Sequence, residues 1–179
     1  MAESFWSDSQ VEPKRAYRWI LLLGGIPQWM CKKVSKPSFA VSETEHTYLN
    51  HKFYYPGRVE WNTVTVTLAD PVAPDAAKTM FNIIQNSGYS LPVDQGKAEA
   101  STISKANAVS ALGEVRIQQL GADGKAIEEW ALVNAWVKDV KLGELDYESD
   151  DMVDVELELR YDYATLKGTG TSAVPLNKK

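Results

Sequence analysis

Residues 153 to 163 alternate strictly between apolar and charged side chains. Valine, leucine and tyrosine occupy the odd positions from Val153 to Tyr163, and acidic residues or arginine occupy the even positions from Asp154 to Asp162. Because successive side chains of a strand leave opposite faces, this period predicts a half-buried antiparallel strand within residues 146 to 163. The charged face alone is most simply explained as a solvated surface.

Alternation predicts further strands along most of the chain. Residues 16 to 23 and 28 to 34 flank a Gly-Gly-Ile-Pro turn, which indicates an opening hairpin. After the turn signal Pro56-Gly57, valine and leucine alternate with threonine through residues 63 to 68. Two more strands are expected at 113 to 120 and 126 to 137, and a loop with a short strand leads from there into the final strand.

Residues 74 to 87 are the one main helix that the pattern predicts. Asp75 lies near the first turn, while Met80, Phe81 and Ile84 recur with helical spacing and Gly88 offers a stop. We therefore expect a mainly β protein, in which two antiparallel sheets form a sandwich or flattened barrel with this helix on its flank.

Composition adds the domain organisation. A chain of 179 residues with 44% hydrophobic residues can close one core, so we expect a leader at 1–14, one β domain at 15–166 and a flexible extension at 167–179. The net charge of -5 argues against a general nucleic-acid binder. The acidic N-terminus and the short apolar run at 19–26 predict neither export nor membrane insertion.

Candidate chemistry is sparse. His46 and His51 are the only histidines, and on an extended arm a spacing of five would place them on opposite faces. Cys31 is the single cysteine, so a disulfide framework is excluded. The carboxylates from Glu148 to Asp154 lack the spacing of a calcium loop, and the charged strand lacks an apolar pocket that would raise a carboxyl pKa. We expect no catalytic, cofactor-binding or metal-binding residues, and an enzyme is the weaker hypothesis.

Several short stretches carry a family resemblance. They are VEWNTVTVTLADP (59–71), AAKTMFNIIQ (76–85), IEEWALVNAWVKDV (127–140), LGELDYES (142–149) and LRYDYA (159–164). In this order they resemble the tail tube proteins of contractile-tailed bacteriophages, over roughly residues 15 to 164. Tube proteins of type VI secretion and tailocin machines share that fold.

The resemblance implies a structural virion protein of the tail tube, made in the host cytoplasm. Family members form hexameric rings, and the rings stack into a channel through which double-stranded DNA passes into the host. The implied partners are further copies of the chain and the sheath, baseplate and tail terminator proteins. Neither a membrane nor a cofactor is implied.

Two sets of residues become candidates for these roles. The lumen candidates are Asp154, Glu156, Glu158, Arg160, Asp162, Thr63, Thr65 and Thr67, because an acidic or neutral wall would not bind DNA as lysine and arginine do. The competing placement puts these faces under the sheath. The candidates for contact between rings are His51, Phe53, Tyr54, Tyr55 and Arg58, within the segment 42–58, where a consecutive aromatic run is expected to be covered. The simpler alternative is a hairpin folded on its own sheet.

Other functions stay open at this point. A tube-initiating protein of the baseplate or a secretion-tube paralogue would have the same fold. From another class, a monomeric β-sandwich that binds a ligand or carbohydrate would use Trp61, Trp130 and Trp136 to stack on sugar rings.

Overall fold

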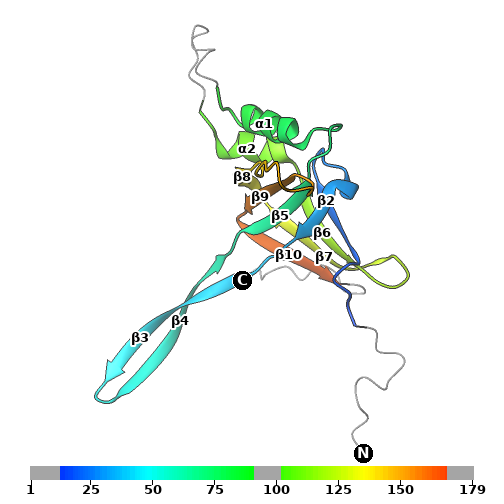
Figure 1. The fold of residues 1–179 in the computed structure, drawn as a ribbon. Coiled ribbons are helices and arrows are strands. Elements are labelled where there is room, and N and C mark those ends of the chain that lie inside the picture. Colours follow the sequence, from blue (N-terminus) through cyan, green and yellow to red (C-terminus); the bar gives the residue numbers. More distant parts are fainter. Residues whose placement is uncertain (1–12, 91–101, 169–179) are drawn as a thin grey trace, which may run out of the picture.

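Ten strands form two antiparallel sheets and one free hairpin in the computed structural model, which describes residues 13–90 and 102–168 (Figure 1). Sheet A contains, in spatial order, β1 (Trp19–Leu23), β6 (Val115–Leu120), β7 (Ala126–Val133) and β10 (Tyr163–Gly168). Sheet B contains β2 (Cys31–Val34), β5 (Val64–Ala69), β9 (Asp154–Arg160) and β8 (Trp136–Lys141). The hairpin consists of β3 (Phe39–Tyr48) and β4 (His51–Trp61). The expected mainly β fold is confirmed.

The core lies between the two sheets and follows the alternation of the sequence. On β5 the side chains of Val64, Val66 and Leu68 are 0% exposed, and so are the apolar side chains of β9 that pair beside them. On sheet A, Leu21 and Ile117 supply the facing apolar surface. Burial of one apolar face from each sheet is the main stabilising contribution in such a sandwich.

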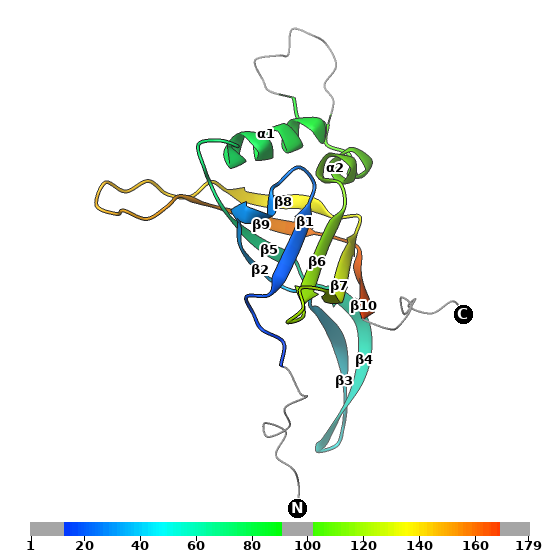
Figure 2. The ribbon, with the colours of Figure 1, turned by 90° about the vertical axis from the view of Figure 1, so that its right-hand side faces the viewer.

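Two helices cover one end of the sandwich (Figure 2). Helix α1 (Ala76–Asn86) begins after Asp75, whose carboxylate accepts a hydrogen bond from the backbone N–H of Lys78 at 2.8 Å. Helix α2 (Lys105–Leu112) begins after Ser104, which caps it in the same way, and buries Ala108 and Leu112. The predicted helix at 74 to 87 is confirmed, whereas α2 lies in a polar stretch for which no element was predicted.

The hairpin projects from the end of the body opposite the helices (Figures 1 and 2). Its strands pair only with each other, and every residue of β3 and β4 is exposed except Trp61, which is half-buried. Phe39 contacts Trp61 edge-on with ring centroids 5.3 Å apart, and Trp61 contacts Tyr161 at 6.0 Å. This aromatic contact anchors the base of the hairpin on the body.

Two predicted turns are wrong. Residues 16 to 34 form no hairpin, because β1 belongs to sheet A and β2 to sheet B, with a short 3-10 helix (η2, Gln28–Met30) between them. Pro56-Gly57 is not a turn either, since it lies inside β4, at a bulge where the register shifts between Val41 and Glu43. The hairpin turns instead at Leu49, whose φ is 51°.

Two predicted strand ranges also differ. The expected strand at 126 to 137 is divided at Asn134, whose φ is 54°, so that β7 and β8 lie in different sheets. The final strand β9 spans only Asp154–Arg160, after a loop at 142–153, and the chain then turns into β10 in sheet A. Strand β10 includes Lys167 and Gly168 of the expected extension, while 169–179 and the leader residues 1–12 lie outside the described residues.

Candidate functional site

The outer face of sheet B brings most of the lumen candidates together. Thr65 pairs with Glu158 and Thr67 pairs with Glu156 across β5 and β9, on the face opposite the buried valine and leucine side chains. The hydroxyl of Thr63 donates a hydrogen bond to Glu158 at 2.7 Å. The alternation of two separate sequence segments therefore produces one continuous polar surface.

Lysines neutralise the carboxylates of this surface. The distance from the lysine Nζ to the nearest carboxylate oxygen is 2.7 Å in the pair Lys32–Asp154, 3.1 Å in Lys141–Glu156 and 2.9 Å in Lys138–Glu158. Hydrogen bonds from Lys138 and Thr63 lower the pKa of Glu158, and Glu156 raises the pKa of Lys141. The face carries three ion pairs and is not the mainly acidic wall expected from β9 alone, since the pairing lysines come from β8 and β2.

Arg160 follows Glu158 at the end of this face, whereas Asp162 lies apart from it. Arg160 ends β9 opposite Trp136, and Asp162 stands in the turn to β10. Lys105 of α2 and the side-chain amide of Asn134 each donate to Asp162 at 2.7 Å, and these bonds lower its pKa. Asp162 thus joins helix α2 to the corner where sheet B passes into sheet A.

A cavity of about 510 Å³ opens at that corner. We call it the corner cavity; its lining residues are Ile103, Ser104, Lys105, Ala108, Trp136, Arg160, Tyr161 and Asp162. Its walls combine apolar side chains with two cations and one carboxylate. No signal in the sequence brings these three segments together, because the cavity depends on how α2 packs against β8.

The candidates for contact between rings divide between the two faces of the hairpin. The register pairs Phe53 with His46 and Tyr55 with Thr44, whereas Tyr54 pairs with Glu45 on the other face. We call the first the aromatic face; it carries Thr44, His46, Tyr48, His51, Phe53 and Tyr55. Arg58 lies at the bulge, where its backbone N–H donates to the Ser42 hydroxyl at 2.8 Å.

The expectation that the two histidines lie on opposite faces is wrong. His46 is opposite Phe53, and His51 is opposite Tyr48, so both imidazoles belong to the aromatic face. A spacing of five gives opposite faces only on one continuous strand, and a turn at Leu49 separates these two residues. Within residues 13–90 and 102–168 no group of three or more His, Cys, Asp or Glu side chains is placed to hold a metal ion.

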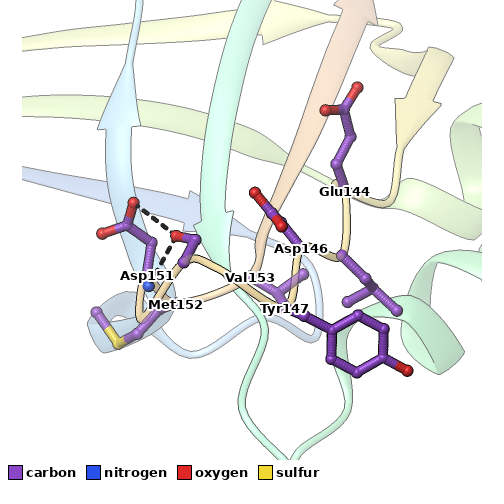
Figure 3. A pocket seen from close by; sticks show the side chains of 8 residues that line it. Glu144, Asp146, Tyr147, Asp151, Met152 and Val153 are labelled. Carbon is purple, nitrogen blue, oxygen red and sulfur yellow. Dashed lines mark hydrogen bonds between the residues drawn. The ribbon is translucent and has the colours of Figure 1, made fainter.

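The loop at 142–153 is the second projecting segment, and a cavity of about 490 Å³ opens along it (Figure 3). Leu145 and Tyr147 are exposed there, and Ser149 donates to Asp151 at 3.2 Å. Glu144, Asp146 and Asp151 point in different directions and do not converge on one point (Figure 3). This geometry does not suit a cation site.

Glu128 is a charged residue that the sequence reasoning missed. It lies on β7 with only 11% of its side chain exposed, and Lys14, Lys36 and the Trp130 indole N–H all donate to it. Burial would raise the pKa of Glu128, but the hydrogen bonds from the two lysines and Trp130 lower it to about 2. This carboxylate ties the segments beside β1 and β2 to sheet A.

The three tryptophans proposed for sugar stacking do not form a common platform. Trp61 lies under Phe39 at the hairpin base, Trp130 is on sheet A and donates to Glu128, and Trp136 is on sheet B. All three are half-buried. In the described part of the chain, no helix is long and apolar enough to cross a membrane.

Comparisons by sequence find no matching family model and no matching curated protein. Comparison with solved structures finds the same fold in contractile injection machines. A chain from the tube-terminating cap of the anti-feeding prophage has a TM-score of 0.65 at 16% identity, covering 94% of this chain and 100% of that one. A chain from the baseplate of the same particle has a TM-score of 0.62 at 16% identity, with coverages of 90% and 99%.

A third similar chain comes from the sheath-tube complex of PVC, an extracellular contractile injection system. Its TM-score is 0.60 at 18% identity, covering 88% of this chain and 93% of that one. At such identities the likeness establishes the fold. Two four-stranded sheets, the flanking helices and the projecting hairpin are therefore the tail-tube fold of contractile injection systems.

Proposed function

We propose that this chain is a structural subunit of a contractile tail, in which six copies form a ring and stacked rings form the inner tube. The proposal rests on the tail-tube fold. The structural match to a chain of a tube-terminating cap covers 94% of this chain. The sheath, baseplate and tail terminator are the expected neighbours of such a tube.

Ring closure has a physical basis in the open edges of the sheets. β2 and β8 are the outermost strands of sheet B, and β1 and β10 are those of sheet A. Unpaired strand edges invite uncontrolled association, which pairing around a closed ring prevents. We propose that β8 of one copy pairs with β2 of the next, so that sheet B continues around the ring.

The outer face of sheet B then lines the channel. Lys32, Lys138 and Lys141 on this face are held in ion pairs with Asp154, Glu156 and Glu158, so these three lysines are less available to phosphates than unpaired cations. Thr65 and Thr67 add small polar side chains beside them. Such a wall lets double-stranded DNA pass without retaining it.

Electron microscopy of the purified protein tests assembly directly. The proposal predicts annular particles with sixfold symmetry and a central hole, together with stacked tubes at higher concentration. Light scattering during gel filtration should give a mass near six times 19.9 kDa for single rings. A monomer at every concentration would overturn the proposal.

The channel assignment needs a separate test. Tubes of Glu156→Lys with Glu158→Lys should retain a short DNA duplex on sedimentation, and tubes of the unmodified protein should not. The matched control is Glu148→Lys with Asp150→Lys, which makes the same charge change in the exposed loop. Equal retention by both double variants would show that sheet B does not line the channel.

A further inference from the structure

Trp29 is the one exposed tryptophan among the described residues, with 63% of its surface open to solvent. It lies in η2, a short element that is held firmly on the body. The neighbouring Met30 is buried, and the side-chain oxygen of Gln28 accepts a hydrogen bond from the backbone N–H of Leu21 at 2.7 Å. A tryptophan presented by a fixed element is typical of the centre of a protein–protein contact.

The loop at 142–153 exposes apolar side chains although its end is fixed on the body. Leu145 is 89% exposed and Tyr147 is fully exposed, with its ring projecting outward (Figure 3). The backbone oxygen of Val153 accepts a hydrogen bond from the backbone N–H of Asp70 at 3.0 Å, which attaches the loop beside the end of β5. The loop and η2 are thus two anchored surfaces, each with large uncovered apolar side chains.

The register of sheet B places η2 and this loop at the same end of the sheet. Cys31, the first residue of β2, pairs with Leu68 near the end of β5, and that end of β5 pairs with the start of β9. Lys141, the last residue of β8, pairs with Glu156 near the same start of β9. Within one copy, however, β2 and β8 are the two outer strands, three spacings or about 14 Å apart. Trp29 of the same copy accordingly stays uncovered.

Ring closure through β8 and β2 would bring η2 of the next copy beside the loop. The strands of sheet B alternate in direction, so β2 and β8 run opposite to each other. Cyclic symmetry turns each copy about one axis without inverting it, so β8 meets β2 of the next copy antiparallel, one spacing of about 4.8 Å away. The loop follows β8 and η2 precedes β2, so both extend beyond the same end of this junction. Half of the loop, as extended chain, reaches about 20 Å.

The charges of the two complete segments are opposite. The loop carries no cation, and its carboxylates are Glu144, Asp146, Glu148, Asp150 and Asp151. Residues 24–38, from the turn before η2 to the start of β3, carry no carboxylate, and their cations are Lys32, Lys33 and Lys36. In the part of the chain that the structure describes, Lys33 has no carboxylate at ion-pair distance, whereas Lys32 and Lys36 each have one. The charge of Lys33 is therefore available to a neighbouring molecule.

We propose that the loop at 142–153 of one copy covers Trp29 of the next copy in the same ring. Leu145 and Tyr147 pack on the indole, and the loop carboxylates lie beside Lys33. The inference rests on the proposed ring and adds to it a side-chain contact outside the paired strands. Because the apolar side chains lose water while the charges stay on the rim, removal of the apolar side chains should weaken the ring most.

Chemical cross-linking tests which copy the loop contacts. In a Cys31→Ser background, rings of Lys33→Cys with Glu148→Cys should be bridged by a short bifunctional maleimide into a ladder that ends at six copies on a denaturing gel. The matched control combines Glu148→Cys with Lys125→Cys, in the exposed turn before β7, and should give no ladder. A ladder that continues beyond six copies would place the contact between rings. That result, no ladder from assembled rings, or an equal ladder from the control would overturn the inference.

Truncation of the apolar contact gives a second measurement, which does not depend on cross-linking geometry. Leu145→Ala with Tyr147→Ala should raise the protein concentration at which half of the subunits are in rings by about tenfold or more, as measured by light scattering. Both side chains are exposed in the single subunit, so its fold should not change. The matched control, Tyr48→Ala with Leu49→Ala, removes the same side-chain types from the hairpin tip and should leave single rings unchanged.

The outcomes separate this contact from the proposed function. If the loop variant formed rings at the same concentration as the unmodified protein, the inference would be wrong and the tube function would stand. If the unmodified protein formed no rings at any concentration, both would be wrong.

Discussion

The two-sheet body and the projecting hairpin are both built from antiparallel strands, yet they bury their side chains in different ways. In the body, alternate residues of β5 and β9 are 0% exposed because a second sheet covers them. In the hairpin, all residues of β3 are exposed, including aromatic ones. Pairing of strands is therefore separate from burial, and a hairpin without a covering layer leaves its side chains exposed.

Truncation of the core should have the largest effect. Leu157→Ala removes a fully buried side chain between the sheets and should lower the free energy of unfolding by about 2–5 kcal/mol. Urea denaturation of the subunit measures this change. A loss below about 1 kcal/mol would mean that the sandwich does not depend on this interior.

The same glycine-to-alanine substitution in the body and in the hairpin tests how far each backbone can adjust. A Cβ at Gly24 would lie 2.4 Å from the backbone oxygen of Leu112, so Gly24→Ala should cost about 1–3 kcal/mol through displacement of the body's backbone. In the hairpin, a Cβ at Gly57 would lie 2.4 Å from the hydroxyl of Ser42, an exposed side chain that can rotate at the cost of its hydrogen bond from the Arg58 backbone N–H. Thermal unfolding should show the larger loss for Gly24→Ala, and the reverse order would contradict this account.

Acid should reveal the contribution of Glu128. Its pKa of about 2 in the folded protein lies below the usual value of 4.5, so its stabilisation is present above pH 4.5 and is lost as pH falls towards 2. Allowing for solvent screening of the exposed lysines, Glu128→Gln should cost about 1 kcal/mol at pH 7.

Urea midpoints measured between pH 7 and pH 2 test this prediction. The gap between the unmodified protein and Glu128→Gln should close over the acid range. Glu148→Gln, in the exposed loop, is the matched control and should show no such gap. A gap that stays constant with pH would exclude the ionised carboxylate as its cause.

The smallest effect on the isolated subunit is expected from the hairpin. Phe53→Ala should change the free energy of unfolding by less than about 0.5 kcal/mol, because Phe53 is exposed on the aromatic face. Calorimetry of the unassembled subunit measures the change. A loss of 2 kcal/mol or more would show that the hairpin is part of the cooperative core.

Local signals predicted the elements that depend on few neighbours. The alternation at 63 to 68 and 153 to 159 anticipated β5 and β9, and the cap at Asp75 with its spaced apolar residues anticipated α1. The aromatic run at 53 to 55 identified the projecting arm. These features are visible because side-chain period and capping act within a few residues.

What the sequence could not predict depends on contacts between distant residues. The break at Asn134 sends β7 and β8 to different sheets and requires a positive φ at that residue. Asparagine also occurs at positions with negative φ, so its presence alone does not predict a break. Strict alternation along β4 would place Tyr55 and Phe53 on the same face of the hairpin as Trp61. The bulge near Val41 shifts the register by one residue, so these two side chains lie on the opposite face from Trp61. The lysines that pair with β9 come from strands whose placement only the fold decides.

The placement of the hairpin and the helices at opposite ends gives any stack of this subunit a direction (Figure 2). One terminus displays hairpin tips, and the other displays the helices α1 and α2, so the two termini differ chemically. Growth can then be blocked at each terminus independently, by a protein that covers the hairpin tips or by one that covers the helices. A machine built from such a tube can initiate it at one terminus and limit its length at the other with two unrelated surfaces.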